Sequence, residues 1–311
     1  MKPNKVNIMN ILFLGGGRRV ELAKLFKFRG YKIYSYELNK RVPISSIAQI
    51  VEGYHWKHEG IYNHIVSIIQ NLNIDLVIPL QDEAVLVASK LPEITQVLSP
   101  EYEIAEICFD KKLFENFIVS NPDLAKYYPF EVRNSYPKIV KPRYGFGSRN
   151  LITIDSPFDE ANFFEFNSII NYVVQSKING IEYSVDSYFD KDSKWIDSIP
   201  RQRIRVGSGE VITSLTVEKP NLVEITKFIG ELLKLRGPTN TQYIITPEED
   251  IYILEINSRF GGGYTLSIAA GLDTISLIER DYFNKEFDYI PNQWKRNLLL
   301  ERSYEDHFFQ T

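Results

Sequence analysis

The segment Glu255-Ile-Asn257-Ser-Arg259, with Gln242 on the preceding predicted strand, carries residue types that hold a metal ion. Glu255 and Asn257 are two residues apart on an expected strand, so their side chains share a face. Two oxygen ligands on one face, with a third from the neighbouring strand, suit a hard cation such as Mg²⁺. Arg259 adds a hydrogen-bond donor beside them. A solvated strand face is the alternative, but the apolar flanking residues predict a buried strand, where a carboxylate needs a partner.

A second pattern runs from Lys138 to Ser148, Lys-Ile-Val-Lys-Pro-Arg-Tyr-Gly-Phe-Gly-Ser. It places Lys141 at a strand end before Gly145 and Gly147. Glycines let backbone amides approach phosphate oxygens closely, and the lysine offers a point charge to the same phosphates. The pattern is not a P-loop, because the lysine precedes the glycines. The alternative is a purely structural role, in which the glycines form a hairpin turn in a sheet.

A third pattern is the cluster Gly15-Gly-Gly17 followed by Arg18 and Arg19, between a predicted strand and a helix. Glu37, at the end of the next strand, favours a dinucleotide-binding turn. Val20 opposes it, because the third glycine of that fingerprint belongs at position 20. Two alternatives remain. One is a tight strand-to-helix turn; the other is an anion site, because a helix N-terminus with two arginines attracts carboxylate or phosphate.

Charged residues outside these motifs are weaker candidates. Arg201, Arg203 and Arg205 alternate, so on a strand all three side chains would point the same way, toward a bound carboxylate or phosphate. A solvated basic face explains them equally well. Asp82 and Glu83 follow a predicted strand, where they would face a substrate cleft and bind an amine, a hint of an amino-acid substrate.

The amino-acid composition limits which classes of protein this chain can belong to. The 311 residues are 44% apolar and 24% charged, which is typical of a globular chain. The net charge of −4 disfavours a nucleic-acid binder. The single cysteine, Cys108, excludes an intrachain disulfide and is interpreted as a small core residue. The first residues lack the apolar run of a signal peptide, and no apolar stretch of about 18 residues exists, so we expect a cytoplasmic location without a membrane partner.

The elements that must position these residues fall into two parts. The first hundred residues alternate strand and helix, which predicts a parallel sheet with helices on both faces. The remainder is mixed, with strands dominating from 150 to 215. The expected strands are 10–14, 32–36, 75–79, 138–141, 171–177, 182–189 and 211–217, with a hairpin of 240–246 and 251–256; the expected helices are 20–28, 61–72, 83–91, 109–120 and 221–235.

Taken together and in order, these motifs resemble the ATP-grasp superfamily, and within it the branch like the carbamoyl phosphate synthetase large chain. The resemblance covers nearly the whole chain. It implies an α/β protein with an N-terminal Rossmann-like, parallel-sheet (pre-ATP-grasp) domain at 1–108. Two α+β lobes would clamp ATP: a small lobe with the glycine loop at 109–178, and a C-terminal lobe with the metal site at 179–311.

The resemblance also implies roles for individual residues. Gln175 and the backbone of Lys177 would hold adenine, and Glu182 would bind the ribose hydroxyls. Residues implied to bind ATP are Lys111, Lys141, Gly145, Gly147, Ser148, Gln175, Lys177, Ile178 and Glu182. Residues implied to hold Mg²⁺ or Mn²⁺ are Gln242, Glu255 and Asn257, and Arg259, with Arg203 and Arg201, would serve catalysis. Many superfamily members carry an acid where this chain has Gln242; a glutamine at this position is similar to the carbamoyl phosphate synthetase pattern.

The implied activity is an ATP-dependent carboxylate–amine ligase, or a ligase for another nucleophile, acting through an acyl phosphate on a small carboxylic acid. The chain is too short for carbamoyl phosphate synthesis, which uses two such units and a glutaminase. The competing interpretation is a non-catalytic nucleotide sensor that retains the fold. We expect small-molecule carboxylate and nucleophile substrates and no nucleic acid, and the sequence leaves a homodimer open.

Overall fold

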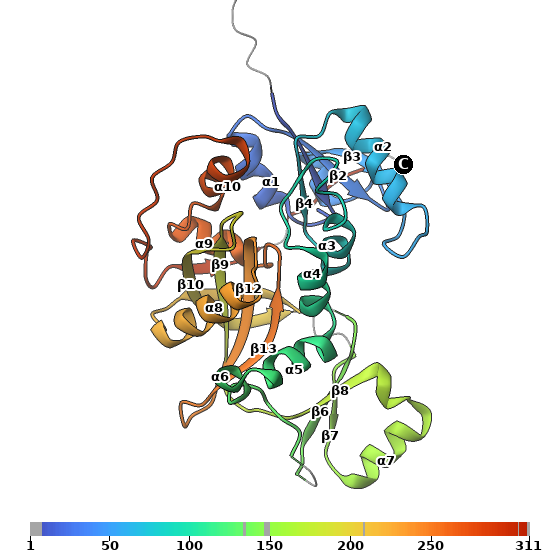
Figure 1. Ribbon diagram of the computed structural model, residues 1–311, viewed down its shortest axis with the longest axis vertical. Helices are drawn as coiled ribbons and strands as arrows, with labels where there is room; N and C mark the ends of the chain where they lie inside the picture. The colour runs from blue at the N-terminus through green and yellow to red at the C-terminus, as the bar shows by residue number, and fades with distance from the viewer. Residues whose placement is uncertain (1–7, 133–134, 146–149, 208, 304, 310–311) are drawn as a thin grey trace, which may run out of the picture.

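Three β-sheets organise the chain in a computed structural model that describes residues 8–132, 135–145, 150–207, 209–303 and 305–309 (Figure 1). A five-stranded sheet comes first, a three-stranded sheet lies at the opposite end of the molecule, and a six-stranded sheet lies between them. None of the helices in these ranges is both long enough and apolar enough to cross a membrane.

The first sheet is parallel, as the sequence predicted, with strand order β3-β2-β1-β4-β5. Alternate residues of β1 enter different cores, Ile11 on the side of α1 and Leu12 on the side of α2 and α3, so helices cover both faces. The elements are β1 (Asn10–Leu14), α1 (Val20–Phe28), β2 (Lys32–Glu37), η1 (Pro43–Ser46), β3 (Gln49–Glu52), α2 (Ile61–Leu72), β4 (Leu76–Pro79), α3 (Asp82–Ala88), β5 (Gln96–Val97) and α4 (Tyr102–Phe109).

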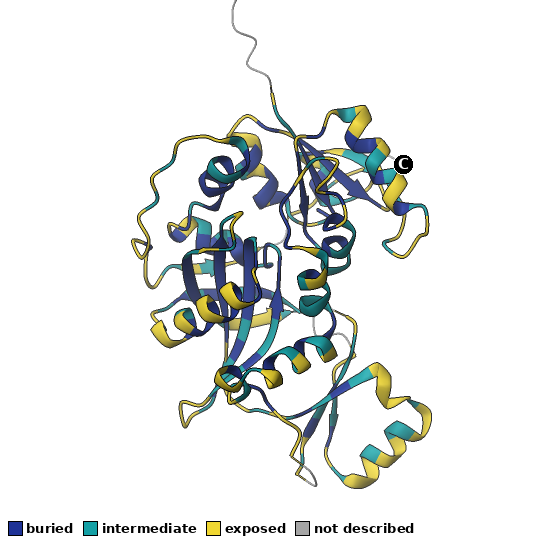
Figure 2. Cartoon of the chain, viewed as in Figure 1, coloured by how far each residue is buried: buried dark blue, intermediate teal, exposed yellow. Residues whose placement is uncertain are grey.

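The three-stranded sheet is antiparallel, in the order β7-β6-β8. Its elements, with the helices that precede it, are α5 (Lys111–Ser120), α6 (Pro122–Ala125), β6 (Lys138–Pro142), β7 (Ile152–Ile154), α7 (Pro157–Phe166), η2 (Ile169–Asn171) and β8 (Tyr172–Ser176). The expectation that strands dominate from 150 onward was wrong at α7. Ser156 caps this helix and Pro157 opens it, yet none of its residues is buried (Figure 2), so no apolar periodicity marked it.

The six-stranded sheet is antiparallel, in the order β13-β12-β9-β10-β11-β14. The predicted hairpin of β12 and β13 is confirmed, with Gln242 directly opposite Glu255. The elements are β9 (Ile181–Phe189), β10 (Trp195–Gly207), β11 (Glu210–Thr216), α8 (Pro220–Leu232), β12 (Gly237–Ile245), β13 (Ile251–Asn257), α9 (Tyr264–Ala270), α10 (Thr274–Phe283) and β14 (Leu299–Glu301).

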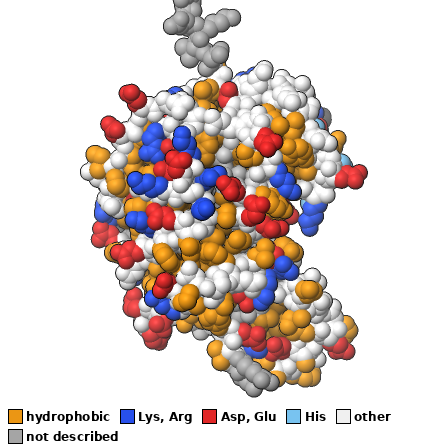
Figure 3. Space-filling view, viewed as in Figure 1, with side chains coloured by type: hydrophobic (Ala, Val, Ile, Leu, Met, Phe, Trp, Pro, Cys, Tyr) orange, Lys and Arg blue, Asp and Glu red, His pale blue; other side chains and the backbone are white. Residues whose placement is uncertain are grey.

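One hydrophobic core joins the first sheet to the six-stranded sheet. Phe13 of β1 and Phe26 of α1 pack in the same buried cluster as Tyr188 of β9, Ile199 of β10 and Tyr264 of α9. Because this interior is shared, the loops that follow β1 and β13 are held at a fixed distance from each other. On the surface drawn in Figure 3, Lys and Arg intermingle with Asp and Glu.

Candidate active site

A pocket of about 530 Å³ lies where the three sheets meet. Its walls come from the glycine turn after β1, from β6 and β8, and from β9 to β13. Among the described residues, eight lining side chains are cationic and four are acidic, so the pocket is electropositive in a chain of net charge −4. The cations are Arg18, Arg19, Lys111, Lys141, Lys177, Arg201, Arg203 and Arg259; the acids are Asp82, Glu182, Glu210 and Glu255.

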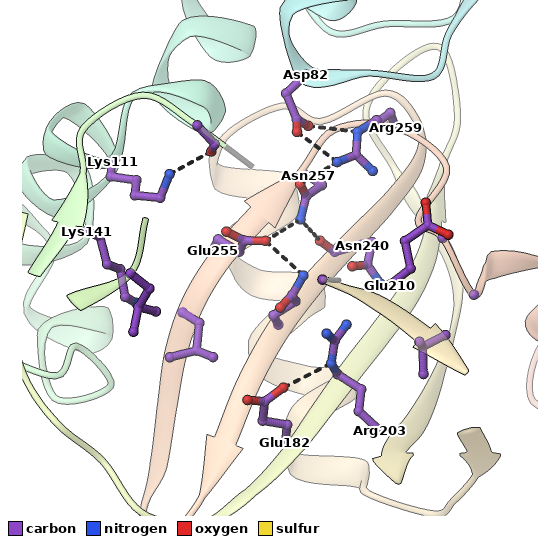
Figure 4. A pocket seen from close by; sticks show the side chains of 18 of the residues that line it. Asp82, Lys111, Lys141, Glu182, Arg203, Glu210, Asn240, Glu255, Asn257 and Arg259 are labelled. Carbon is purple, nitrogen blue, oxygen red and sulfur yellow. Dashed lines mark hydrogen bonds and ion pairs between the residues drawn. The ribbon is translucent and has the colours of Figure 1, made fainter. Parts of the chain in front are cut away.

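The three predicted metal ligands all line this pocket, and Glu255 and Asn257 lie side by side in it (Figure 4). Glu255 accepts hydrogen bonds at its Oε1 from Nε2 of Gln242 at 2.8 Å and from Nδ2 of Asn257 at 3.1 Å. One carboxylate and two amide groups on neighbouring strands are residue types that can supply oxygen ligands to Mg²⁺ or Mn²⁺. Here the amide nitrogens face Glu255, and the role of the three residues as metal ligands stays a prediction. Glu255 supplies the only negative charge of the three.

The two predicted phosphate-binding lysines line one side of the pocket. Lys111, at the start of α5, donates to the carbonyl of Gly145 at 2.8 Å, so it is attached to the glycine loop. Burial lowers the pKa of Lys141 to about 8; Glu255 opposes this shift, and the neighbouring Lys111 adds to it. A buried lysine beside another cation gains from an anionic partner, which favours its charged form. Gly147 and Ser148 lie outside the described residues.

The residues implied to bind adenine and ribose lie at the junction of β8 and β9. Gln175, Lys177, Ile178 and Glu182 all line the pocket. The backbone amide of Lys177 donates to the Pro137 carbonyl at 3.1 Å, so its own carbonyl is the group left for a base. The roles of these residues stay predictions.

The three alternating arginines of β10 do not share one environment. Arg203 points into the pocket, where its Nε donates to Glu182 at 3.0 Å. The expectation that Arg205 points the same way was wrong: the strand changes register between Arg203 and Arg205, and the exposed Arg205 pairs with Glu301 at the surface.

Arg201 is 1% exposed and forms a buried ion pair with Asp186. The carboxylate accepts from Nε and Nη2 of Arg201 at 2.6 and 3.1 Å, and from Asn240 and Ser267 at 2.6 and 2.7 Å. Nη1 of Arg201 has no hydrogen-bond partner among the described residues and belongs to the pocket wall. Its catalytic role stays a prediction.

Arg259 projects from the end of β13 and pairs with Asp82 at the start of α3 (Figure 4). Its Nη2 donates to Asp82 at 2.8 Å and to Oδ1 of Asn257 at 2.9 Å. Asp82 lines the pocket, as expected, but its carboxylate is engaged by Arg259, so an amine would compete with this cation; that role stays a prediction. Glu83 is not among the residues that line the pocket.

The structure adds pocket residues that the sequence analysis did not single out. Glu210 of β11 lines the wall, and Arg302, after β14, donates to both Glu210 and the Gly262 carbonyl. The triplet Gly261-Gly-Gly263 directly after Arg259-Phe260 was a signal that could have identified this loop. No motif surrounds Glu210 or Arg302, so only the fold reveals them.

Comparison with known sequences finds related proteins. A family model described as "ATP-grasp in the biosynthetic pathway with Ter operon" matches residues 168–297, from the end of the small sheet through the predicted metal ligands to the segment after α10. The matched segment, less than half of the chain, is an ATP-grasp segment. The carbamoyl phosphate synthase large chain of Pseudothermotoga lettingae is 23% identical over 235 residues, which cover 66% of this chain and 21% of that relative.

Solved structures share the fold. The biotin carboxylase domain of Hydrogenobacter thermophilus 2-oxoglutarate carboxylase, solved with MgADP, ADP and bicarbonate, superposes with a TM-score of 0.74 at 12% identity. That similarity covers 93% of this chain and 73% of that chain. The L-amino acid ligase of Bacillus licheniformis superposes with a TM-score of 0.68 at 14% identity, covering 88% and 74%. At such identities the likeness establishes the ATP-grasp fold.

Proposed function

We propose that this protein is an ATP-dependent ligase that joins a small carboxylic acid to an amine or another nucleophile through an acyl phosphate. The observation that carries the proposal is the convergence, in one pocket, of Lys141, Glu255, Asn257 and Arg259. The match to the ATP-grasp family model and the MgADP bound in the Hydrogenobacter biotin carboxylase domain support MgATP as the cosubstrate.

ATP would enter with its base at the β8–β9 junction and its phosphates toward the lysines. Gln175 and the carbonyl of Lys177 would hold the base, and Glu182 would accept hydrogen bonds from the ribose. Lys111 and Lys141 would contact the phosphates. Glu255, with the oxygens of Asn257 and Gln242, would hold Mg²⁺, which when bound neutralises phosphate charge.

The acid substrate would lie between the phosphates and the glycine turn after β1. Its carboxylate oxygen attacks the γ-phosphorus, the bond to the β-phosphate oxygen breaks, and ADP leaves. The nucleophile then adds to the acyl carbon, the intermediate collapses, phosphate leaves, and the nucleophile loses a proton. Arg259 is positioned to stabilise the oxyanion of that intermediate, because Asp82 and Asn257 fix its guanidinium. An amino acid is a suitable acid, as in the L-amino acid ligase with the same fold.

A nucleotide sensor is the second candidate. It needs adenine and phosphate contacts but no electropositive space beyond the phosphates. The pocket continues past Glu255 to Arg18 and Arg19 on the first sheet, which favours an enzyme with a further substrate.

A hydroxylamine-trapping assay tests the proposal. Hydroxylamine replaces the unknown nucleophile and converts any acyl phosphate to a hydroxamate, while ADP is released in equal amount. Small acids and amino acids are supplied singly and then in pairs without hydroxylamine. We expect hydroxamate with at least one acid. MgATP binding without hydroxamate or acid-stimulated ADP release across the panel would refute the ligase and favour the sensor.

A further inference from the structure

Three arginines from distant parts of the chain donate hydrogen bonds to backbone carbonyls of the loop that follows β13. Arg259 donates to the carbonyl of residue 260 at 3.1 Å, Arg19 to that of residue 261 at 3.4 Å, and Arg302 to that of residue 262. They come from the end of β13, from the glycine turn after β1, and from the segment after β14. These three guanidinium groups therefore meet at one loop, and Arg19 and Arg259 also line the pocket.

Two of the three have carboxylate partners. Arg259 pairs with Asp82, and Arg302 pairs with Glu210 at 3.1 Å. Arg19 has no carboxylate within ion-pair distance in the described part of the chain, and its hydrogen bond to a carbonyl is long. Burial and the nearby Arg259 lower the pKa of Arg19 to about 10, and Glu210 and Asp82 oppose this shift. These two carboxylates already pair with Arg302 and Arg259, so the partly buried guanidinium of Arg19 gains free energy from a bound anion.

The backbone around Arg19 adds positive potential. Arg19 is the N-cap residue of α1, a nine-residue helix without a side-chain cap, so the positive end of the helix dipole faces the pocket at this residue. Arg18, next to it, also lines the pocket and is exposed. The helix N-terminus and the two arginines therefore both favour an anionic ligand.

Glycines keep this end of the pocket open. A Cβ on Gly262 would lie 3.3 Å from Nη1 of Arg19. A Cβ on Gly263 would lie 2.7 Å from Nη1 of Arg201, the buried group without a partner. With any larger residue at these two positions, a side chain would crowd the guanidinium groups of Arg19 and Arg201. The glycines therefore leave space beside Arg19 at the pocket wall.

We propose that Arg19, supported by Arg18 and Arg302, binds a second anionic group on the acid substrate, a carboxylate or a phosphate separate from the carboxylate that is activated. This inference rests on the proposed function. It narrows the substrate class to dicarboxylic or phosphorylated acids, because a monocarboxylic acid would give Arg19 no anion at ion-pair distance.

Calorimetry on protein loaded with Mg²⁺ and a non-hydrolysable ATP analogue tests the proposal without requiring turnover. Matched pairs differ only in the second anion: glutamate and glutamine, aspartate and asparagine, phosphoserine and serine. We expect one anionic member to bind at least about tenfold more tightly than its neutral partner. Preference for phosphoserine indicates a phosphate, and preference for glutamate or aspartate a carboxylate.

Variants then assign the preference to Arg19. In Arg19→Gln the ratio of affinities within the preferred pair should fall by about tenfold or more, while affinity for the ATP analogue stays within a few-fold. Lys27→Ala, on the exposed side of the same helix, is the control and should preserve the ratio. Equal affinity within every pair, no binding of any member, or an unchanged ratio in Arg19→Gln would overturn the proposal. Hydroxamate formation with monocarboxylic acids in the same preparations would leave the ligase proposal intact.

Discussion

Arg259 at the end of β13 and Asp82 at the start of α3 form an ion pair, with Nε of the guanidinium 2.7 Å from a carboxylate oxygen of Asp82. The pair joins the six-stranded sheet to the first sheet beside the predicted metal ligands. Both side chains are mostly buried, so the charges are only weakly screened. The pair can hold the two sheets together, orient Arg259 for catalysis, or do both.

Arg259→Ala separates these roles. If Arg259 stabilises a transition state, kcat should fall by about a hundredfold or more while ATP affinity stays within a few-fold. Arg259→Lys should restore little of the lost kcat, because the point charge of an ammonium group does not reproduce the planar, two-pronged guanidinium group. Asp82→Asn keeps Arg259 but loosens its orientation, so we expect a smaller loss of kcat. A Tm lowered by several degrees, with activity and ATP affinity falling together, would assign the pair to structure alone.

Glu255→Gln tests the metal site. The substitution retains the shape and removes the only negative charge of the predicted ligand set, so Mg²⁺ should bind far more weakly. Phosphate release at ordinary Mg²⁺ concentrations should be abolished, with folding unchanged by circular dichroism. Glu248→Gln, on the exposed turn of the same hairpin, is the control and should behave as wild type. Wild-type turnover in Glu255→Gln would place the metal elsewhere.

Lys141→Ala and Glu182→Ala test the nucleotide site. Each variant removes a charged hydrogen-bonding group predicted to contact ATP, so each should cost roughly 1.5–3 kcal/mol of binding free energy, about ten- to a hundredfold in Kd. Calorimetry with MgATP measures the Kd of each variant. Lys112→Ala, whose amine pairs with Glu115 at the surface, is the matched control. Unchanged affinity in either folded variant would contradict that residue's assignment.

The lowered pKa of Lys141 predicts that ATP affinity depends on pH. The amine titrates near pH 8 in the free protein. Phosphates favour its charged form and raise its pKa, so binding above pH 8 takes up a proton. Affinity should be constant below pH 8 and fall as pH rises above it, by up to about tenfold per unit. Lys141→Arg, which stays charged, should remove the dependence; a slope that persists in this variant would show that another group titrates.

Asp186→Asn tests the buried pair behind the pocket. The carboxylate balances the charge of Arg201, and both side chains are almost fully buried. Removing one partner leaves an uncompensated cation, so the free energy of unfolding should fall by about 3–5 kcal/mol, measured by urea denaturation. Glu301→Ala breaks the exposed pair with Arg205 and should change stability by less than about 1 kcal/mol. Equal losses of unfolding free energy in the two variants would show that burial does not determine how much an ion pair contributes to stability.

The sequence alone determined the local elements and the motifs. Apolar patterns located β1, β2 and β4 of the first sheet and the hairpin of β12 and β13, because burial imposes a regular pattern, but they missed the short edge strands β3 and β5. The spacing of two residues placed Glu255 and Asn257 on one face, and their hydrogen bond confirms it. Where a helix buries nothing, as in α7, that signal was missing.

Tertiary structure decided what each charge faces. Arg201, Arg203 and Arg205 look equivalent in the sequence, but the irregular register of β10 and the neighbouring strands give them different carboxylate partners. Arg19 and Arg302 lie far apart along the chain, and only the packing of the first sheet against the six-stranded sheet brings both to the loop after β13. Periodicity follows from local geometry, whereas the partner of a charge depends on which distant segments the shared core brings together.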